Sequence, residues 1–486
     1  MVNSDFFMNI LDLTITQLHE GFRNKNFTSV EVTKAYLENI KKTDKEIGAY
    51  LLVTEGLALN QAEKADKLIS LALSGVEGNG GDFPLLMGVP FSVKDAILVE
   101  GQKATAGSKI LENYVAPYDA TVIKKLKTQG AVILGKTNLD EFAMGVSTEN
   151  SAFKVTKNPN DLTRVSGGSS GGSAASVAAK QAVYSLGSDT GGSIRLPASF
   201  CGVVGLNPTY GAVSRSGLIS MASSLDQIGP ITKTVEDCRI VFDAIKGKDP
   251  LDATSIESQI SNFKSEIKNI KIGVPKEYFG RGINSNVKKI IEDAIKKAKK
   301  HGAKIVPISL PNSKYAVACY YIIVPSEVSA NLARFDGIKY GLYEDAENLL
   351  DGYMKTRGRG FGIEVKRRIM LGTYSLSSGY YDAYYKKAQE VRQIIKEDFI
   401  DAFKKVDLIF SPVSPIPAFK IGEKTDDALS MYLMDIYTCP VKLAGLPAIS
   451  LPVGNIGKLP VGLQIIGKYF EENKIFNIAS QLEKML

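Results

Sequence analysis

Apolar residues recur at helical spacing through residues 1–80, which predicts a mainly helical beginning of the chain. Thr28-Ser-Val-Glu31 has the pattern of a capping box, so we expect a helix to start there. A second periodic stretch runs from Leu57 to Ser74. The glycine-rich residues 75–82 that follow predict a surface loop.

Beyond residue 85 the pattern changes to short apolar runs that alternate with amphipathic stretches. We expect Asp119 and glycine-containing turns to mark the ends of helices that alternate with buried strands. Such alternation is typical of an α/β sheet with helices on both faces. No repeat or long low-complexity linker interrupts the pattern, so we expect residues 1–486 to form a single domain. The expected strands are 87–93, 131–134, 182–186, 303–310, 407–410, 448–454 and 460–467, and the expected helices are 119–129, 286–301 and 380–403.

Composition narrows the class of protein only a little. The 486 residues are 44% hydrophobic and 23% charged, which is ordinary for a globular protein. A net charge of +7 permits an RNA or acidic partner without requiring one. No apolar run approaches the ~20 residues of a membrane helix, and the first residues lack the features of a secretory signal. We therefore expect a cytoplasmic protein that does not enter a membrane.

Cysteine and histidine usage limits the possible chemistry. The four cysteines stand far apart, which favours buried thiols over a zinc site or a disulfide framework: Cys201, Cys238, Cys319 and Cys439. The two histidines, His19 and His301, both lie in helical patterns, and we expect both to be solvated. Histidine is the commonest general base, so a hydrolase with this sequence would use another group.

A serine- and glycine-rich segment, Gly167-Gly-Ser-Ser-Gly-Gly-Ser173, allows three interpretations besides the one favoured below. A flexible linker is disfavoured because an alanine-rich helical stretch follows at once. A phosphate-binding loop is disfavoured because Ser173 stands where its lysine is required. The nucleophile elbow of α/β-hydrolases, at Ser169 or Ser170, would require His301 as its base.

A second glycine-rich segment, Gly187-Ser-Asp-Thr-Gly-Gly-Ser193-Ile-Arg195, follows an expected strand. Glycines beside a serine allow successive backbone N–H groups to converge on one point, as an oxyanion hole requires. The N–H groups of Thr190, Gly191, Gly192 and Ser193 are the candidates. We expect Asp189 and Arg195 to be structural partners that hold this loop.

Lys94 lies upstream of both segments, directly after the apolar run Gly88-Val-Pro-Phe-Ser-Val93. Taken alone it could be a surface lysine just past a strand. If it is buried, however, its pKa falls, and the neutral amine could draw a proton from one serine through another. Serine–lysine pairs are a known variant of nucleophilic catalysis.

These three pieces together resemble the amidase signature family. The resemblance implies a large mixed β-sheet covered by helices on both faces, with a helical part at about 1–80 and a catalytic signature region at about 85–230. It also implies that Ser193 is the nucleophile, that Ser169 is the bridging serine, usually found in a cis peptide, and that Lys94 is the general base. Such a site needs no metal.

Further stretches resemble one group within that family, the glutamine-hydrolysing subunits of tRNA-dependent amidotransferases. In that group a tyrosine, an arginine and an aspartate hold glutamine, and the matching positions are Tyr320, Arg368 and Asp435. Tyr321 adjoins the first and is an alternative to it. The supporting stretches are Asp140-Glu-Phe-Ala-Met-Gly145, Ser223–Pro230, Arg334-Phe-Asp-Gly337, Val365-Lys-Arg-Arg368 and Ser377–Tyr385.

This resemblance implies hydrolysis of glutamine to glutamate and ammonia, with the ammonia passed to a partner B subunit. That subunit would use ATP and magnesium to convert Glu-tRNA(Gln) to Gln-tRNA(Gln), and a C subunit would complete a heterotrimer. This chain would need no cofactor of its own. Two alternatives remain: a stand-alone amidase for another carboxamide, and a non-catalytic scaffold subunit. The sequence departs from the family pattern at Asn160, Ser166 and Asn207, the last in place of a basic residue.

Overall fold

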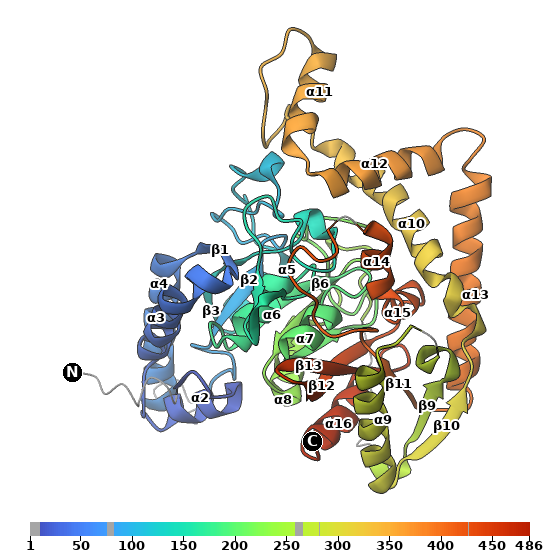
Figure 1. The fold of residues 1–486 in the computed structure, drawn as a ribbon. Helices are drawn as coiled ribbons and strands as arrows, with labels where there is room; N and C mark the ends of the chain where they lie inside the picture. Colours follow the sequence, from blue (N-terminus) through green and yellow to red (C-terminus); the bar gives the residue numbers. More distant parts are fainter. Residues whose placement is uncertain (1–9, 75–81, 258–265, 281, 426) are drawn as a thin grey trace.

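One mixed β-sheet of eleven strands runs through the centre of the computed structural model (Figure 1). The structure describes residues 10–74, 82–257, 266–280, 282–425 and 427–486. The strand order is β1-β3-β2-β6-β8-β7-β12-β13-β11-β9-β10. The strands are β1 Tyr50–Val53, β2 Pro90–Lys94, β3 Val132–Thr137, β6 Tyr184–Asp189, β7 Val204–Asn207, β8 Gln227–Thr232, β9 Lys271–Pro275, β10 Lys304–Ile308, β11 Leu408–Pro412, β12 Ala448–Ile456 and β13 Leu459–Ile466; β4 Lys157–Asn158 and β5 Asp161–Val165 form a separate pair.

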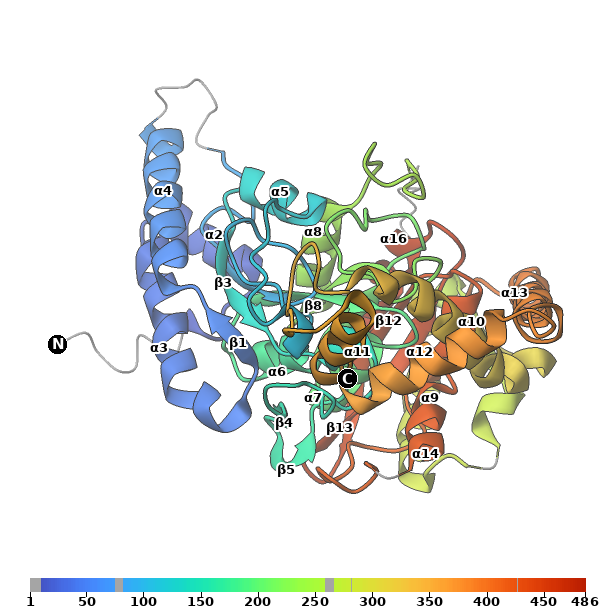
Figure 2. The same ribbon diagram turned by 90° about the horizontal axis from the view of Figure 1, so that it is seen from above.

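Helices cover the sheet, as the sequence pattern predicts. Two of them, α6 and α7, pack on each other and on the central strands, while α8 and α16 form a second pair over strands of the same region. Seen from above, α3 and α4 lie at one side of the molecule and α13 at the other (Figure 2). The helices are α2 Ile15–Arg23, α3 Ser29–Ile47, α4 Glu55–Ser74, α5 Thr121–Thr128, α6 Gly171–Ala178, α7 Arg195–Cys201, α8 Val235–Ile245, α9 Ser285–Lys300, α10 Ala316–Asn331, α11 Leu349–Gly360, α12 Ile363–Leu376, α13 Lys387–Phe403, α14 Ala428–Tyr432, α15 Cys439–Leu443 and α16 Glu472–Glu483.

The N-terminal part follows the predicted pattern with one addition. Thr28 caps α3, and Glu31 reaches back to the Thr28 N–H at 2.8 Å, so the capping box is confirmed. Between α3 and α4 the chain forms β1, which pairs with β3 and was not predicted. Of the predicted surface loop at 75–82, residues 75–81 lie outside the described residues.

Two local expectations are wrong because a tertiary partner bonds to the side chain, and a third describes one helix where the structure has two helical segments. Asp119 does not cap α5; it accepts a hydrogen bond from the Glu100 N–H and pairs with Lys127 at 2.7 Å. His19 is buried, and its Nε2 lies 3.1 Å from the Phe83 carbonyl oxygen. The expected helix at 380–403 is divided into a π-helical turn, η7 Asp382–Lys386, and α13.

One helical segment is a longer apolar stretch than the sequence analysis expects. Residues Pro311–Arg334, which include α10, are long and apolar enough to cross a membrane by length and composition, so the expectation that no apolar run approaches that length is corrected. Half of its apolar window is buried inside the structure. Ile323, Val324 and Val328 of α10 belong to a hydrophobic core cluster shared with α12 and α13. We therefore interpret α10 as a core helix.

The arrangement of β2 and β6 creates the candidate site. These strands are parallel neighbours, with Ser92 opposite Ser185 and Val93 opposite Leu186. The carboxyl ends of parallel strands meet at the same edge of a sheet. Lys94 is the last residue of β2 and Asp189 the last of β6, so the sheet brings the lysine and the second glycine-rich segment together.

Candidate active site

Lys94 is fully buried and is surrounded by hydroxyl groups. Its Nζ lies 2.8 Å from Ser169 Oγ, 2.9 Å from Ser170 Oγ and 2.9 Å from Ser188 Oγ. The Ser170 hydroxyl donates to the Ser188 carbonyl oxygen at 3.0 Å, so Ser170 Oγ can only accept from the lysine. A neutral amine with its N–H groups directed at Ser170 and Ser188 directs its lone pair at Ser169.

Electrostatics favour that neutral form near physiological pH. Burial lowers the pKa of Lys94 from 10.5 to about 7, because the interior disfavours the ammonium. The carboxylates of Asp140, Asp189 and Asp226 oppose the shift and keep the pKa from falling further. An amine that titrates near neutrality can both accept and return a proton.

The first serine- and glycine-rich segment is rigid. Residues from Gly171 onward form α6, all of them buried up to Val177, and Ser173 Oγ lies 2.8 Å from Thr137 Oγ1. A Cβ on Gly172 would meet the Asn138 carbonyl oxygen at 2.5 Å, so glycine is required there. The Gly168–Ser169 peptide bond is cis. This structure excludes a flexible linker.

Hydrogen bonds fix the direction of two backbone N–H groups in the loop at residues 189–193, where the sequence predicts an oxyanion hole. The Gly191 carbonyl oxygen accepts from Arg195 at 3.3 Å, and the Gly192 carbonyl oxygen accepts from the Leu196 N–H at 2.8 Å. Because C=O and N–H point in opposite directions across a peptide bond, the N–H groups of Gly192 and Ser193 point away from α7. The Ser193 carbonyl oxygen accepts from the Ser170 N–H at 3.0 Å, which joins the two serine-bearing segments.

Asp189 and Arg195 hold this loop, as the sequence predicts. Arg195 Nη2 lies 2.9 Å from Asp189 Oδ1, and both side chains are fully buried. Asp189 also accepts from the Ile194 N–H at 3.1 Å, and Arg195 donates to Gln464 Oε1 at 2.6 Å. The ion pair therefore ties the loop to β13 and to the start of α7.

Two of the expected substrate-binding residues contact this loop at its glycines. A Cβ on Gly191 would lie 2.7 Å from the Tyr320 hydroxyl oxygen. One on Gly192 would lie 3.0 Å from Asp435 Oδ1. Burial and the nearby Asp189 carboxylate raise the pKa of Asp435 to about 7. The glycines are thus needed for close approach of the side chains beside Ser193.

Arg368 joins the same group of side chains through aromatic rings. Its guanidinium carbon lies 5.1 Å from the centre of the Tyr321 ring, and the Tyr321 hydroxyl lies 3.5 Å from Asp435 Oδ2. A cavity of about 110 Å³ is bounded here by residues of α12, of α14 and of the segment at 145–150, and Tyr321 and Arg368 line it. The structure therefore brings Tyr320, Arg368 and Asp435 to one region, together with Tyr321, the alternative to Tyr320.

Sequence reasoning missed several buried groups around the lysine. Ser170 and Ser188 contact Lys94 directly, as described above. Asp140 accepts from the N–H groups of Thr148 and Asn150, and a side chain on Gly168 would meet Asp140 Oδ2 at 2.1 Å. Burial raises the pKa of Asp140 to about 6. The sequence marks the segments that contain Ser170 and Asp140, but no residue pattern assigns these groups to the lysine, since their roles depend on where the backbone brings them.

The competing chemistries receive no support from the described residues. His301 is exposed at the end of α9, and its Nδ1 lies 2.9 Å from the carbonyl oxygen of Lys297 in its own helix. All four cysteines are buried and unpaired. Among the described residues, no group of three or more His, Cys, Asp or Glu side chains could hold a metal ion.

The departure from the family pattern at Asn207 has a partner in the structure. Buried Lys442 Nζ, whose pKa burial lowers to about 7, lies 2.9 Å from Asn207 Oδ1, so α15 supplies an amine beside the position where a basic residue is usual. We expect Asn207→Leu to lower the free energy of unfolding by about 1–3 kcal/mol, because Lys442 loses its acceptor. The exchange Asn207→Lys with Lys442→Asn should restore most of that loss in urea denaturation. A double variant no more stable than Asn207→Leu contradicts this pairing.

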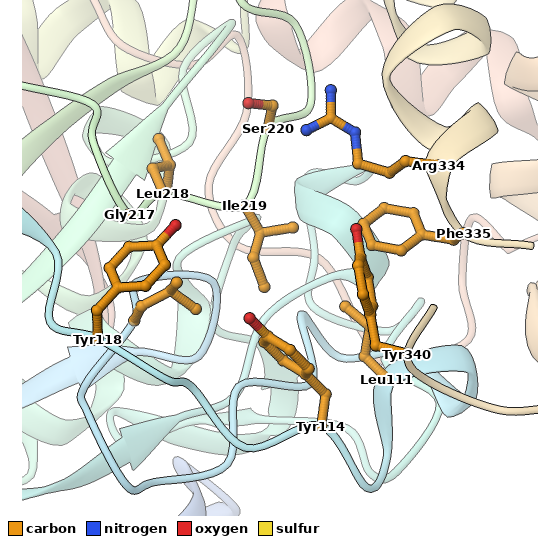
Figure 3. Close-up of a pocket in the computed structure, with 11 residues that line it drawn as sticks. Leu111, Tyr114, Tyr118, Gly217, Leu218, Ile219, Ser220, Arg334, Phe335 and Tyr340 are labelled. Atoms are coloured by element: carbon orange, nitrogen blue, oxygen red, sulfur yellow. The ribbon is translucent and has the colours of Figure 1, made fainter. Parts of the chain in front are cut away.

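A separate cavity of about 130 Å³ is lined by residues 217–220 and by Tyr114, Tyr118 and Tyr340 (Figure 3). The hydroxyls of Tyr114 and Tyr118 point into it, and Arg334 lies at its rim. Arg334 donates to the Asn331 carbonyl oxygen, and Asn331 in turn donates to the Met221 carbonyl oxygen at 3.1 Å. None of the residues that line this cavity is among the site residues described above.

Comparisons with known proteins agree with this geometry. The family model described as Amidase matches residues 31–476. The chain is 56% identical over 482 residues to the A subunit of glutamyl-tRNA(Gln) amidotransferase from Caldanaerobacter subterraneus subsp. tengcongensis, covering 98% of this chain and 97% of that protein. It is 55% identical to the protein of the same name from Microcystis aeruginosa, with 97% of each chain covered. A crystal structure of the protein of that name from Thermotoga maritima is 44% identical, with a TM-score of 0.80 and coverage of 98% and 95%.

Proposed function

The chain belongs to the amidase family, and from this premise we propose that it is the glutamine-hydrolysing subunit of a tRNA-dependent amidotransferase. One observation carries the proposal: buried Lys94 contacts Ser169 beside a loop that Tyr320 and Asp435 touch at Gly191 and Gly192. The expected proton relay and the expected binding site for a charged amino acid would therefore lie on either side of the same loop. Relatives more than half identical over nearly the full length support the same assignment.

In this proposal Ser193 Oγ attacks the side-chain carbonyl carbon of glutamine. The hydroxyl proton of Ser193 moves to Ser169 as the proton of Ser169 moves to the neutral amine of Lys94. The N–H groups of residues 190–193 stabilise the oxyanion. The C–N bond then breaks as the relay returns a proton to the leaving nitrogen, and ammonia departs from a γ-glutamyl ester. Water, deprotonated by the same relay, hydrolyses the ester to glutamate.

The pocket supports glutamine over a simple carboxamide. Arg368 can bind an α-carboxylate with two hydrogen bonds, and Asp435 can pair with an α-ammonium. The substrate ammonium would favour the ionised form of Asp435, whose carboxyl pKa is about 7 in the free protein. An uncharged amide would have no group to pair with the positive charge of Arg368 or the negative charge of Asp435.

The partners follow from the same proposal. A B subunit would use ATP and Mg²⁺ to activate Glu-tRNA(Gln) and accept the ammonia, and a C subunit would join the two in a cytoplasmic heterotrimer. Exposed apolar side chains support an assembly: Leu349, Leu350 and Met354 of α11 and Ile363 and Met370 of α12 are between 64% and 72% exposed. Residues 1–486 would act as one amidase domain, because strands from residue 50 to residue 466 share one sheet.

Substrate analogues test the proposal. Arg368→Gln should raise KM for glutamine by at least about tenfold but leave hydrolysis of 4-aminobutanamide, which lacks the α-carboxylate, nearly unchanged. Asp435→Asn should do the same for glutamine but not for 4-carbamoylbutanoate, which lacks the α-ammonium. Ammonia release is measured for the chain alone and with the B and C subunits.

The alternatives give different results in that assay. An assembled wild-type complex that ignores glutamine but cleaves other amides indicates a stand-alone type of amidase. A complex that cleaves no amide but still requires this chain for binding tRNA indicates a scaffold. Dependence of glutamine cleavage on the partner subunits identifies the amidotransferase.

A further inference from the structure

Glu364 is a buried carboxylate at the expected substrate pocket. The reaction described above does not use it. It lies one helical turn before Arg368 on α12, and its side chain is 9% exposed. Its Oε1 accepts from Arg368 Nε at 2.8 Å and from the Tyr432 hydroxyl at 3.0 Å, while Oε2 pairs with Arg367. Both carboxylate oxygens are therefore engaged before any substrate arrives.

Arg368 is held on more than one side. The side chain is 3% exposed, and its guanidinium lies over the rings of Tyr321 and Tyr432, with distances of 5.1 and 5.7 Å from the guanidinium carbon to the ring centres. The two rings stack on each other with centroids 3.9 Å apart. Since Glu364 bonds to Nε, the two terminal nitrogens of the fork are the atoms placed to meet a carboxylate.

Tyr432 brings a second part of the chain into this arrangement. It ends the short helix α14, whereas Glu364 and Arg368 belong to α12 and Tyr321 to α10. Its hydroxyl bonds to Glu364 and its ring covers Tyr321. All four side chains line the cavity of about 110 Å³.

We propose that Glu364 is a positioning residue that, together with Tyr432, fixes the Arg368 guanidinium in the orientation that binds the α-carboxylate of the substrate. This inference rests on the proposed function, since it assumes that Arg368 meets that carboxylate. Glu364 then determines specificity indirectly: it selects carboxamides that carry a carboxylate at the far end from the scissile bond. Holding the fork in place before binding removes an ordering cost that the substrate would otherwise bear.

The test uses the full chain assembled with its partner subunits. Glu364→Gln keeps the side-chain shape but removes the charge that orients Arg368, and we expect KM for glutamine to rise about tenfold with kcat within about twofold of wild type. Tyr432→Phe keeps the stacked ring and loses one hydrogen bond, so KM should rise by a smaller factor, about threefold. Glu236→Gln is the control, because Glu236 forms an exposed i,i+3 ion pair with Arg239 on α8.

Two readouts separate positioning from general damage. With 4-aminobutanamide as substrate, Glu364→Gln should behave as wild type, because that substrate has no carboxylate for Arg368 to bind. If this analogue is cleaved too slowly to measure, Glu364→Gln is added to Arg368→Gln, where it should raise KM for glutamine no further. An unchanged or lower KM for glutamine in Glu364→Gln, an equal loss on both substrates, or a full additional loss in the Arg368→Gln background overturns the inference. Failure of the wild-type complex to cleave glutamine overturns the proposed function instead.

Discussion

We expect Ser193→Ala to lower kcat for glutamine hydrolysis by about 10⁴-fold while changing glutamine affinity by no more than a few-fold. The substitution removes the atom that attacks the amide carbon. It leaves the peptide N–H groups of the loop in place, because the Gly191 and Gly192 carbonyl oxygens stay bonded to Arg195 and the Leu196 N–H. A small residual rate from the oxyanion hole is therefore compatible with the mechanism.

Two measurements check this result. Ammonia release gives the rate, and mass spectrometry after treatment with an electrophilic glutamine analogue should find the label on Ser193 in wild type and none at that position in the variant. Ser173→Ala is the matched control, because Ser173 is a buried serine of the neighbouring segment that bonds to Thr137 and to the Leu186 carbonyl oxygen. We expect it to retain activity. Activity of Ser193→Ala within tenfold of wild type means that another atom is the nucleophile.

Much of the fold could be predicted because its signals are local. Hydrophobic periodicity and a capping box indicated α3, α4 and α9, and short apolar runs indicated β2, β3, β12 and β13. The order of the strands carries no such signal. β7 pairs with β12, far along the chain, through contacts such as Leu206 opposite Ile449. The resemblance to the amidase signature family, and not the pattern of residues, indicated a mixed sheet.

The errors share a physical cause, which is that a tertiary partner overrode a local preference. The helical pattern around His19 predicted solvent exposure, but Phe83 covers its ring, with centroids 4.3 Å apart. Asp119 stood where a cap is common, but Lys127 and the Glu100 N–H were better placed to bond to it. Neither partner can be identified from the residues next to the histidine or the aspartate.

In the candidate site, too, the local sequence predicts some features, whereas others depend on tertiary packing. The glycine pattern at 187–193 indicated converging N–H groups without any alignment, because only certain backbones allow them. The state of Lys94 could not be derived, since a lysine after a strand is exposed or buried depending on what packs over it. Here Ser170, at the start of α6, and Ser188, near the end of β6, enclose it. Glu364 and Tyr432 were missed because their importance lies in contacts between three helices.

We expect Lys94→Met to abolish glutamine hydrolysis, with a loss of about 10⁴-fold or more, since no other base within the described residues contacts Ser169. In wild type, kcat at saturating glutamine, where the bound ammonium keeps Asp435 ionised, should fall about tenfold per pH unit below pH 7. The neutral amine is the active form, and the pKa of Lys94 is about 7, so protonation removes the base as the pH falls. A wild-type rate that stays level down to pH 5.5 contradicts this role for Lys94.

The same substitution should stabilise the protein in mildly acidic solution. Below pH 7 the amine is protonated in both the folded and the unfolded chain, so the folded protein bears the full cost of a buried ammonium. That cost disappears between pH 7 and 10.5, where the folded amine is neutral and the unfolded one progressively becomes so. Methionine avoids it but leaves three serine hydroxyls without the amine, so we expect a net gain of about 1–3 kcal/mol at pH 6 that shrinks toward pH 10.

Lys136→Met gives the matched contrast. Lys136 is equally buried, but its Nζ lies 2.9 Å from Asp95 Oδ1, whose carboxylate is 1% exposed. Removing one partner of a buried ion pair leaves the other uncompensated, so this variant should lose about 3–5 kcal/mol of unfolding free energy in urea denaturation at pH 6. Opposite signs for two buried lysines on adjacent strands would show that Lys94 is kept for chemistry at a cost in stability, whereas Lys136 is kept for structure. A loss of stability in Lys94→Met as large as that in Lys136→Met means that Lys94 is a structural cation and not a poised base.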